Sequence, residues 1–372
     1  MPKIPKILHI ITTIESGGAE NQLLILINEQ IKHGHVISCL PLKGLPELDQ
    51  KLLDIGVDLI TAPRGMTFLR QILYTRKMLR NESFVIHCHL PRAEVLGFLV
   101  KNRDSKLILT RHNSESFFPR IDIRLASMLS RLVVQKADEI VFISKSVLNF
   151  CETHNEITSE SNKNIVYYGY KRLKNDFEDK ELPNIEQIRY WKSSGMKIIG
   201  TIARLEKQKD LETFLRAAKL LMKRDPNIRF IIVGKGSMQN ELRNLAHNLG
   251  LSDLIMFYGR TSASVKLIKL FDVFVLSSKY EGFGMVLLEA MDAKVPIVAA
   301  NNSSIPEVLG NSYPSLFKTG NVNELTDKIE FLLNNSEFKV KILQILQERM
   351  KKFSSLRMER HMDEIYEKAL AK

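Results

Sequence analysis

Short apolar runs alternate with amphipathic stretches along most of this chain, and this alternation restricts its fold more than any other feature. Within the stretch 19–32, apolar residues recur at helical spacing, namely Leu23, Leu24, Ile27 and Ile31. Short apolar runs joined by such helices are typical of βαβ units with parallel strands. The runs that predict strands in the first half are 7–14, 36–40, 84–88, 107–110, 139–143 and 165–167.

The alternation stops once, across 171–195, and then resumes. This stretch is polar, mixed in charge and contains Pro183, so we predict a linker there. After it, strands are expected at 197–202, 230–233, 254–257, 273–276 and 296–299, and helices at 210–223, 238–249, 265–269 and 285–293. The pattern of the first half is therefore repeated in the second.

The chain of 372 residues is long enough for two domains. We predict an α/β fold with two doubly wound, Rossmann-like domains, at 1–175 and 190–355, whose sheets face each other across a cleft. The last helix, at about 356–372, has one apolar face and needs a partner surface. We expect it to pack back on the first domain.

Composition excludes several classes of protein. The longest early apolar run, 7–14, is far shorter than the roughly 20 residues of a membrane-spanning helix, and it lacks the cleavage site of a secretion signal. The three cysteines have no CxxC spacing, as is typical of thiols in a reducing compartment. We therefore expect a cytoplasmic protein without a membrane span.

The net charge of +12 is concentrated in one region. Between residues 60 and 136 there are 14 lysines and arginines against 5 carboxylates, whereas the rest of the chain is nearly balanced. Such a region attracts substrate phosphates, an anionic membrane or nucleic acid, and a solvated basic surface is the plain alternative. Its basic residues alternate mainly with aliphatic ones and no nucleic-acid-binding module is recognisable, so we expect no nucleic-acid partner.

A glycine pair, Gly17 and Gly18, follows the first predicted strand. The two glycines allow a tight turn that exposes backbone amides at the start of a helix, a construction that receives anions. The spacing is not GxGxxG, so a dinucleotide-dependent dehydrogenase is disfavoured. An ordinary strand-to-helix turn is the alternative interpretation.

Two cations, Arg204 and Lys209, lie in the loop after the strand predicted at 197–202. This loop is expected at the carboxyl edge of a parallel sheet, where ligands bind. A guanidinium binds phosphate oxygens bidentately and an ammonium adds a point charge, so the pair suits a diphosphate. A glycine turn follows the next strand, and we assign Gly234 and Arg260 to the same binding site.

The sharpest motif is a glycine loop between two glutamates, Glu281 and Glu289. It follows the strand predicted at 273–276 and leads into a helix whose free amides favour an anionic ligand. Carboxylates accept hydrogen bonds from vicinal hydroxyls, so the two glutamates are suited to hold two sugars of one ligand with phosphates between them. The residues of the loop and the first helical turn are Gly282, Phe283, Gly284, Met285 and Val286.

Together these motifs resemble the retaining glycosyltransferases of family 4, which have the two-domain GT-B fold. The resemblance covers nearly the whole chain, and it includes 296–298, 306–307 and the C-terminal segment 353–366. It implies a nucleotide-sugar donor bound to the C-terminal domain and an acceptor bound mainly to the N-terminal domain. No cofactor is implied beyond the donor substrate itself.

The resemblance also implies roles for single residues. Glu289 resembles the ligand of the ribose hydroxyls, and Glu281 resembles the contact to the donor-sugar hydroxyls. Arg204 and Lys209 resemble the diphosphate clamp, on which the Gly17–Gly18 turn would close from the other domain. These residues are therefore assigned to the donor site, with catalytic roles for Glu281 and the two cations.

His112 follows the strand predicted at 107–110 and matches a histidine that approaches the donor sugar and phosphate in relatives. We predict it as a catalytic residue on that resemblance, although a lone histidine is more often structural. The chain departs from the family pattern at Lys294, where glycine is usual, and at 301–304 and 167–170. Because 301–304 lies near where relatives shape the cleft, this departure bears on any donor or acceptor preference inferred by analogy.

The predicted reaction is transfer of a hexose or N-acetylhexosamine from a UDP-sugar, with retention at the anomeric carbon. Departure of the diphosphate develops negative charge, which Arg204, Lys209 and helix amides can stabilise without a metal. His87 and His89 alternate along a predicted strand, but no third ligand is evident, so we predict no metal site. A front-face path, in which the departing phosphate takes the acceptor proton, is favoured, and a covalent intermediate stays open.

The expected acceptor is a glycan, such as a lipid-linked oligosaccharide or a lipopolysaccharide or capsule precursor. A basic N-terminal domain without a spanning helix fits a peripheral enzyme on the anionic cytoplasmic face of a membrane. Two other readings stay open. A UDP-sugar 2-epimerase or a phosphorylase would share the clamp, and a non-enzymatic polyanion-binding protein would explain the charge but leave Glu281 and Glu289 without a role.

Overall fold

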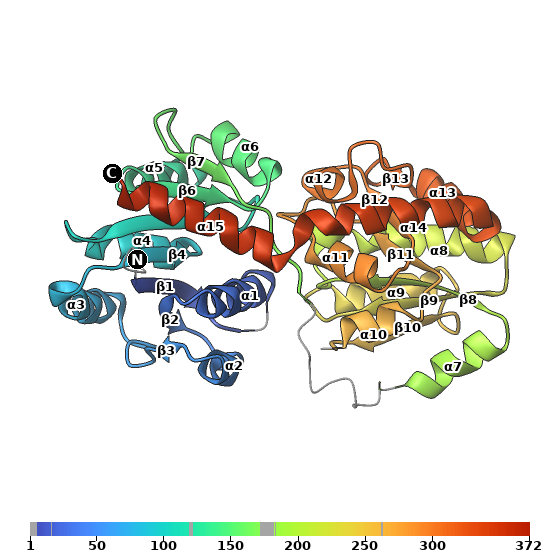
Figure 1. Ribbon diagram of the computed structural model, residues 1–372. Helices are drawn as coiled ribbons and strands as arrows, with labels where there is room; N and C mark the ends of the chain where they lie inside the picture. The colour runs from blue at the N-terminus through green and yellow to red at the C-terminus, as the bar shows by residue number, and fades with distance from the viewer. Residues whose placement is uncertain (1–5, 16, 119–121, 172–181, 183, 262) are drawn as a thin grey trace. The chain divides into compact units, whose positions relative to one another are not determined.

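The computed structural model describes residues 6–15, 17–118, 122–171, 182, 184–261 and 263–372. The chain divides into two compact units (Figure 1). The N-terminal unit comprises Met1–Lys171 and Phe353–Lys372, and the C-terminal unit comprises Arg172–Lys352. The last helix of the chain therefore belongs to the N-terminal unit.

The N-terminal unit is built on a parallel sheet of seven strands in the order β3-β2-β1-β4-β5-β6-β7. Its central strands are almost wholly buried, as expected of a parallel sheet covered on both faces. The strands are β1 (Lys6–Thr13), β2 (Val36–Lys43), β3 (Asp58–Leu59), β4 (Val85–His89), β5 (Lys106–Arg111), β6 (Glu139–Phe142) and β7 (Lys163–Ile165). Its helices are α1 (Gly18–Lys32), α2 (Asp49–Asp54), α3 (Phe68–Met78), α4 (Pro91–Val100), α5 (Ile123–Val134), α6 (Lys145–Thr153) and α15 (Ser355–Leu370).

Helix α15 returns to the N-terminal unit and packs beside α1 (Figure 1). Its apolar face, including Met362 and Tyr366, is buried. A close backbone approach fixes its start, since a Cβ on Gly169 would lie 2.6 Å from the Cα of Ser355. Residues more than 300 positions apart thus share one hydrophobic core.

The C-terminal unit contains a second parallel sheet, of six strands in the order β10-β9-β8-β11-β12-β13. The strands are β8 (Lys197–Ile202), β9 (Ile228–Val233), β10 (Ile255–Gly259), β11 (Val273–Leu276), β12 (Ile297–Ala300) and β13 (Leu316–Phe317). Its helices are α7 (Ile185–Ser193), α8 (Leu211–Arg224), α9 (Gln239–Asn248), α10 (Ser264–Ile268), α11 (Met285–Asp292), α12 (Ile305–Leu309), α13 (Val322–Asn334) and α14 (Ser336–Met350). The predicted α/β fold with two doubly wound sheets is confirmed.

The structure corrects the sequence-based elements in several places. The predicted linker 171–195 contains helix α7, which buries Ile188 and Trp191, and residues 172–181 and 183 of that stretch lie outside the described residues. Ile185, Ile188 and Trp191 do recur at helical spacing, but a run of nine residues within a polar, charged stretch is too short for this period to stand out. The strand expected at 165–167 lies at 163–165 instead, and the two-residue strands β3 and β13 were too short to predict.

None of the helices in the described parts of the chain combines the length and the apolar composition needed to cross a bilayer.

Candidate functional site

Two loops of the C-terminal unit meet at the carboxyl edge of its sheet. The Lys209 ammonium, in the loop after β8, donates to Glu281 Oε1 at 2.6 Å, and Glu281 lies in the loop after β11. The Ser278 hydroxyl donates to the same oxygen at 2.7 Å. Only 12% of the Lys209 side chain and 8% of the Glu281 side chain are exposed. The structure therefore joins two of the four predicted catalytic residues in a partly desolvated ion pair.

Backbone contacts hold these loops together. Lys279 donates its amide to the carbonyl of Gln208 at 2.8 Å, and the Gln208 side chain donates to the carbonyl of Tyr280 at 3.1 Å. The amide of Glu281 donates to the Ser303 hydroxyl at 2.8 Å, within the loop 301–304 that departs from the family pattern. Glu281 is therefore held, through its carboxylate and its backbone, by contacts from three segments of the unit.

Arg204, the other predicted clamp residue, extends into solvent. Its guanidinium approaches Gln208 Oε1 at 3.5 Å, the long limit of a hydrogen bond. The loop that carries it packs tightly on the loop after β9, because a Cβ on Gly234 would lie only 1.9 Å from the carbonyl oxygen of Ala203. Gly234 has a φ of 138°. Glycine is thus required there for the two loops to approach, and Arg204 is an exposed cation at the same sheet edge as Lys209.

The glycine loop leads into α11 as predicted. Gly284 has a φ of 85° and precedes the first helical residue, Met285. Glu289 lies one turn further, partly buried, and burial raises its pKa while a hydrogen bond with Ser264 lowers it. Arg260 is exposed just after β10, at the same edge of the sheet. The contact described for Glu289 is with α10 and does not join it to the Lys209–Glu281 pair.

In the N-terminal unit, the predicted glycine turn lies at the start of α1. Gly17 is in extended conformation, and a Cβ there would lie 2.3 Å from Glu20 Oε2, while Gly18 has open space around its Cα. The Thr13 hydroxyl donates to Glu20 Oε1 at 2.8 Å, which ties the end of β1 to the helix. Ser16, which precedes the glycines, lies outside the described residues.

His112 follows β5 and is buried, with both ring nitrogens hydrogen-bonded inside the N-terminal unit. Its Nδ1 pairs with the Tyr168 hydroxyl, and its Nε2 lies 3.1 Å from His89 Nδ1. Burial lowers the pKa of His112 to about 3, so the imidazole is neutral at physiological pH. A role for His112 as a cation is thereby disfavoured. For a neutral Nδ1 to bind a substrate, the Tyr168 hydroxyl would have to move away from it.

A third imidazole, which was not evident from the sequence, lies beside His87 and His89. His9 of β1 lies opposite His87 of β4 in the parallel register, and donor atoms of the three histidines lie within 4.8 Å of one another. His9 is therefore the third potential ligand that was not evident from the sequence, and the prediction of no metal site stays a prediction. His9 lies in the first predicted strand, but the pairing of β1 with β4 cannot be read from their positions in the chain.

Comparisons with known proteins relate both units to glycosyltransferases. Residues 16–162 match the family described as Glycosyltransferase Family 4, and residues 186–353 match Glycosyl transferases group 1. The putative glycosyltransferase EpsD of Bacillus subtilis is 33% identical over 49% of this chain and 49% of its own length. The poly(ribitol-phosphate) alpha-N-acetylglucosaminyltransferase of Staphylococcus aureus is 31% identical over 37% of this chain and 29% of its own length. The chain thus spans half or less of these two relatives.

Other relatives match end to end at lower identity. The capsular polysaccharide biosynthesis glycosyltransferase CapM of Staphylococcus aureus is 20% identical over 98% of this chain and 97% of its own length. The crystal structure of Anabaena HepE in complex with UDP and glucose superposes with a TM-score of 0.78 at 19% identity, covering 98% of this chain and 99% of HepE. This likeness shows the fold, which is GT-B.

Proposed function

This chain belongs to glycosyltransferase family 4, and we propose that it transfers a hexose or an N-acetylhexosamine from a UDP-sugar to a glycan acceptor with retention of configuration. The observation that carries this proposal is the Lys209–Glu281 pair, in which an ammonium and a carboxylate lie together at the edge of one sheet. HepE, which has the same fold, was crystallised with UDP and with UDP-glucose.

Each group in the C-terminal unit has a task in this reaction. The exposed Arg204 guanidinium and the Lys209 ammonium bind the diphosphate and stabilise the charge that develops as it leaves. Glu281, whose carboxylate already accepts from Ser278, accepts further hydrogen bonds from donor-sugar hydroxyls. The departing phosphate takes the acceptor proton, so that the new bond forms on the face from which the diphosphate left.

The donor clamp is tested by thermal unfolding with UDP, GDP, ADP and NAD in parallel. A ligand that binds only the native state raises the midpoint, so we expect UDP to stabilise the wild type and to lose this effect in Arg204→Ala. Arg216→Ala, which removes an exposed arginine from α8, is the matched control. No response of the wild type to any nucleotide would contradict the proposal.

We propose that the leaving group is stabilised without a metal ion. In the C-terminal unit the cations of Arg204 and Lys209 lie at the edge where the diphosphate would bind, and they supply the positive charge that a divalent ion supplies in other transferases. Turnover of a UDP-sugar should therefore persist in EDTA. Loss of activity in EDTA and recovery with Mg²⁺ or Mn²⁺ would refute metal independence while leaving the transfer reaction intact.

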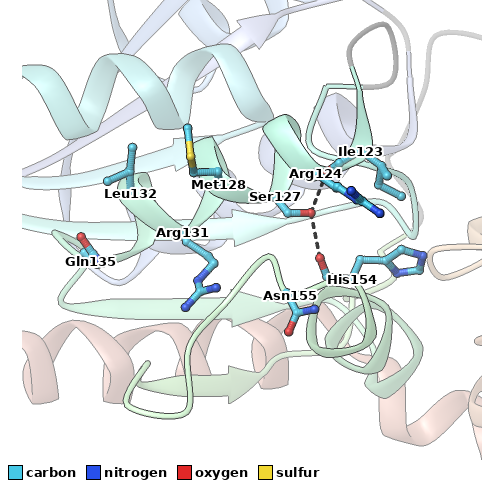
Figure 2. A pocket seen from close by; sticks show the side chains of 9 residues that line it. All are labelled: Ile123, Arg124, Ser127, Met128, Arg131, Leu132, Gln135, His154 and Asn155. Carbon is cyan, nitrogen blue, oxygen red and sulfur yellow. Dashed lines mark hydrogen bonds between the residues drawn. The ribbon is translucent and has the colours of Figure 1, made fainter.

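We further propose that the acceptor is lipid-linked and that the N-terminal unit binds an anionic membrane surface. Helix α5 exposes apolar and basic side chains together, and Figure 2 shows Met128, Arg131 and Leu132 projecting from it around an open pocket of about 690 Å³. The exposed fractions of Met128 and Leu132 are 54% and 44%. On α3, Leu69 and Leu73 are more than half exposed beside further arginines and a lysine.

Salt dependence tests this surface. Each arginine near an anionic bilayer contributes about 1 kcal/mol, so sedimentation with phosphatidylglycerol vesicles should weaken at high ionic strength and in the double variant Arg124→Ala with Arg131→Ala. The control, Arg216→Ala, removes an arginine from the other unit. Vesicle binding that ignores both salt and the double substitution would refute the electrostatic interaction.

A further inference from the structure

Three buried imidazoles in the N-terminal unit are hydrogen-bonded head to tail. His112 Nε2 lies 3.1 Å from His89 Nδ1, and His89 Nε2 lies 3.0 Å from His9 Nδ1. Each ring thus uses its Nδ1 toward one neighbour and its Nε2 toward the next. We call these three residues the histidine chain. It runs from the loop after β5, across β4, to the middle of β1.

Both ends of the histidine chain have polar partners. At one end, His112 Nδ1 pairs with the Tyr168 hydroxyl. At the other end, His9 Nε2 lies 2.9 Å from Gln30 Oε1, and Gln30 Nε2 donates to the Tyr366 hydroxyl at 2.9 Å. Gln30 comes from α1 and Tyr366 from α15, and both are buried. The chain of contacts therefore extends from the edge of the sheet to the C-terminal helix.

One amide fixes the direction of all these hydrogen bonds. Because Gln30 Oε1 can only accept, His9 must carry its proton on Nε2, which leaves its Nδ1 as an acceptor. His89 must then donate from Nε2, and His112 must do the same in turn. The result is that His112 Nδ1 bears no proton and accepts from Tyr168.

The Tyr366 hydroxyl is the partner of the amide nitrogen in this orientation. It accepts from Gln30 Nε2 and lies 2.8 Å from His87 Nδ1, while His87 Nε2 lies 2.6 Å from the Thr110 hydroxyl. With Tyr366 donating to His87, the His87 ring also carries its proton on Nε2. If the amide turned over, all three rings of the histidine chain would have to exchange tautomers together.

We propose that Gln30 and Tyr366 are positioning residues that set the tautomer of His112 through His9 and His89. The tautomer so fixed keeps His112 Nδ1 unprotonated, as an acceptor for a substrate hydroxyl in the place that the Tyr168 hydroxyl occupies here. This inference rests on the proposed glycosyl transfer for its substrate, but the tautomers themselves do not depend on it.

The charge state of the rings supports the proposal. Burial lowers the pKa of His9 to about 4 and that of His112 to about 3, and it holds the pKa of His89 well below the usual value. Each ring therefore carries a single proton at physiological pH, and the head-to-tail contacts leave it one position. A metal held by His9, His87 and His89 is the competing arrangement, but every ring nitrogen of these residues already has a protein partner.

The first test is the tautomers of the full-length wild-type protein, from long-range ¹H–¹⁵N spectra after labelling with ¹⁵N-histidine. We expect His9, His89 and His112 all to be protonated on Nε2. Different tautomers among the three, or protonation of His112 on Nδ1, would overturn the proposal. So would stoichiometric zinc in the purified protein by elemental analysis, because the nitrogens would then be ligands. None of these measurements requires substrate.

The second test removes one hydroxyl. Tyr366→Phe frees the Gln30 amide to turn, so an Nδ1-protonated population should appear in all three rings together. The control is Tyr313→Phe, which removes a buried hydroxyl that donates to the carbonyl of Ile297 in the other unit. Unchanged tautomers in a folded Tyr366→Phe variant would overturn the proposal. If that variant fails to fold, the wild-type spectrum still decides whether the three histidines have the proposed tautomers.

The third test is kinetic. Since a changed tautomer removes the hydrogen bond that His112 Nδ1 accepts from the substrate hydroxyl, Tyr366→Phe should lower kcat by about tenfold with little change in the KM of the UDP-sugar. Tyr313→Phe should leave kcat unchanged. Equal kcat in Tyr366→Phe and the wild type would overturn the role for His112 Nδ1. A wild type that is inactive on all UDP-sugars would instead refute the proposed function, and the tautomer result would be unaffected.

Discussion

The two units share a strand order but fill the middle of their sheets differently. In the N-terminal unit the fourth residue of the central strand β1 is His9, hydrogen-bonded to its neighbours, whereas the fourth residue of β8 is Gly200. A Cβ on Gly200 would lie 2.1 Å from the Phe271 ring, which fills that space. The middle of one sheet therefore contains neutral polar groups among its apolar residues, whereas the same position in the other sheet is filled by an aromatic ring.

Neutral and charged polar groups occupy different places in the two units. Neutral imidazoles are buried at mid-strand because they satisfy one another, so little hydrogen bonding is lost. The charges of Lys209 and Glu281 lie in loops at the sheet edge, where part of their hydration is kept. Fold type alone does not decide this, since both sheets are parallel and doubly wound.

Arg111 carries a buried charge in the otherwise neutral interior of the N-terminal unit. Removing this charge should have the largest effect on the stability of the unit. The guanidinium lies 3.0 Å from Glu94 and 3.2 Å from Glu156, and all three side chains are buried. Burial raises the pKa of Glu94 to about 7, so Glu94 becomes neutral when the guanidinium is removed, but Arg111→Met leaves the buried Glu156 without its counter-charge. We therefore expect a loss of about 3–5 kcal/mol in the free energy of unfolding of this unit. Hydrogen exchange of peptides from β4 and β5 measures it.

The matched control for Arg111 is Arg131→Met, which removes an exposed arginine from α5. Its exchange rates in β4 and β5 should equal those of the wild type. If Arg111→Met also left them unchanged, the buried ion cluster would not contribute to stability, and the contrast between the two interiors would lose its main exception.

Glu281→Gln tests whether the charged edge of the C-terminal unit performs the chemistry. The amide keeps the shape but removes the charge opposite Lys209 and the acceptor strength toward sugar hydroxyls, so kcat should fall by about 100-fold. Glu330→Gln, on α13 where the carboxylate pairs with Arg224, is the control. Turnover of Glu281→Gln within twofold of the wild type would contradict the assigned role.

The neutral interior of the N-terminal unit predicts a pH dependence. His9 has a folded pKa of about 4, below the usual 6.5, so as the pH falls below about 6.5 the unfolded state takes up a proton that the native state does not. The wild type therefore loses stability on acidification through this group. His9→Asn is less stable than the wild type at neutral pH, but its stability does not fall through this group on acidification. The difference in the free energy of unfolding between the two proteins should therefore narrow by about 1.4 kcal/mol from pH 7.5 to 5.5.

Denaturant unfolding followed by far-UV circular dichroism measures that gap at each pH. The intrinsic fluorescence of Trp191, the only tryptophan, reports on the C-terminal unit and serves as the internal control. A gap that stays constant or widens on acidification would show that His9 is protonated in the native protein, contrary to the histidine chain.

The smallest effect is expected at Lys294, where the sequence has lysine in place of the usual glycine. Lys294 has a φ of 57°, a left-handed conformation that costs a residue with a Cβ about 1 kcal/mol. Lys294→Gly should therefore stabilise the C-terminal unit by at most about 1 kcal/mol, measured by Trp191 fluorescence. Lys269→Gly, at a helical φ of −56°, should instead destabilise it.

Much of the fold could be predicted because it depends on local patterns. The predicted strands 197–202 and 273–276 match β8 and β11 to the residue, and the helix predicted at 285–293 differs from α11 by one residue. The contact between Lys209 and Glu281 could only be anticipated as a shared sheet edge, because the two residues are 72 positions apart in the chain, with several elements between them. The roles of these residues and of Arg204 stay predictions.

The sequence alone determined the alternation that builds two parallel sheets, because strand and helix periods are local properties of the side chains. It also determined which loops carry charge at the carboxyl edges. Only the tertiary structure decided that His9, His89 and His112 share one line of hydrogen bonds, closed by Gln30 and Tyr366. The physical reason is that a tautomer depends on partners brought together by strand order and by a helix more than 300 residues away, which no local period encodes.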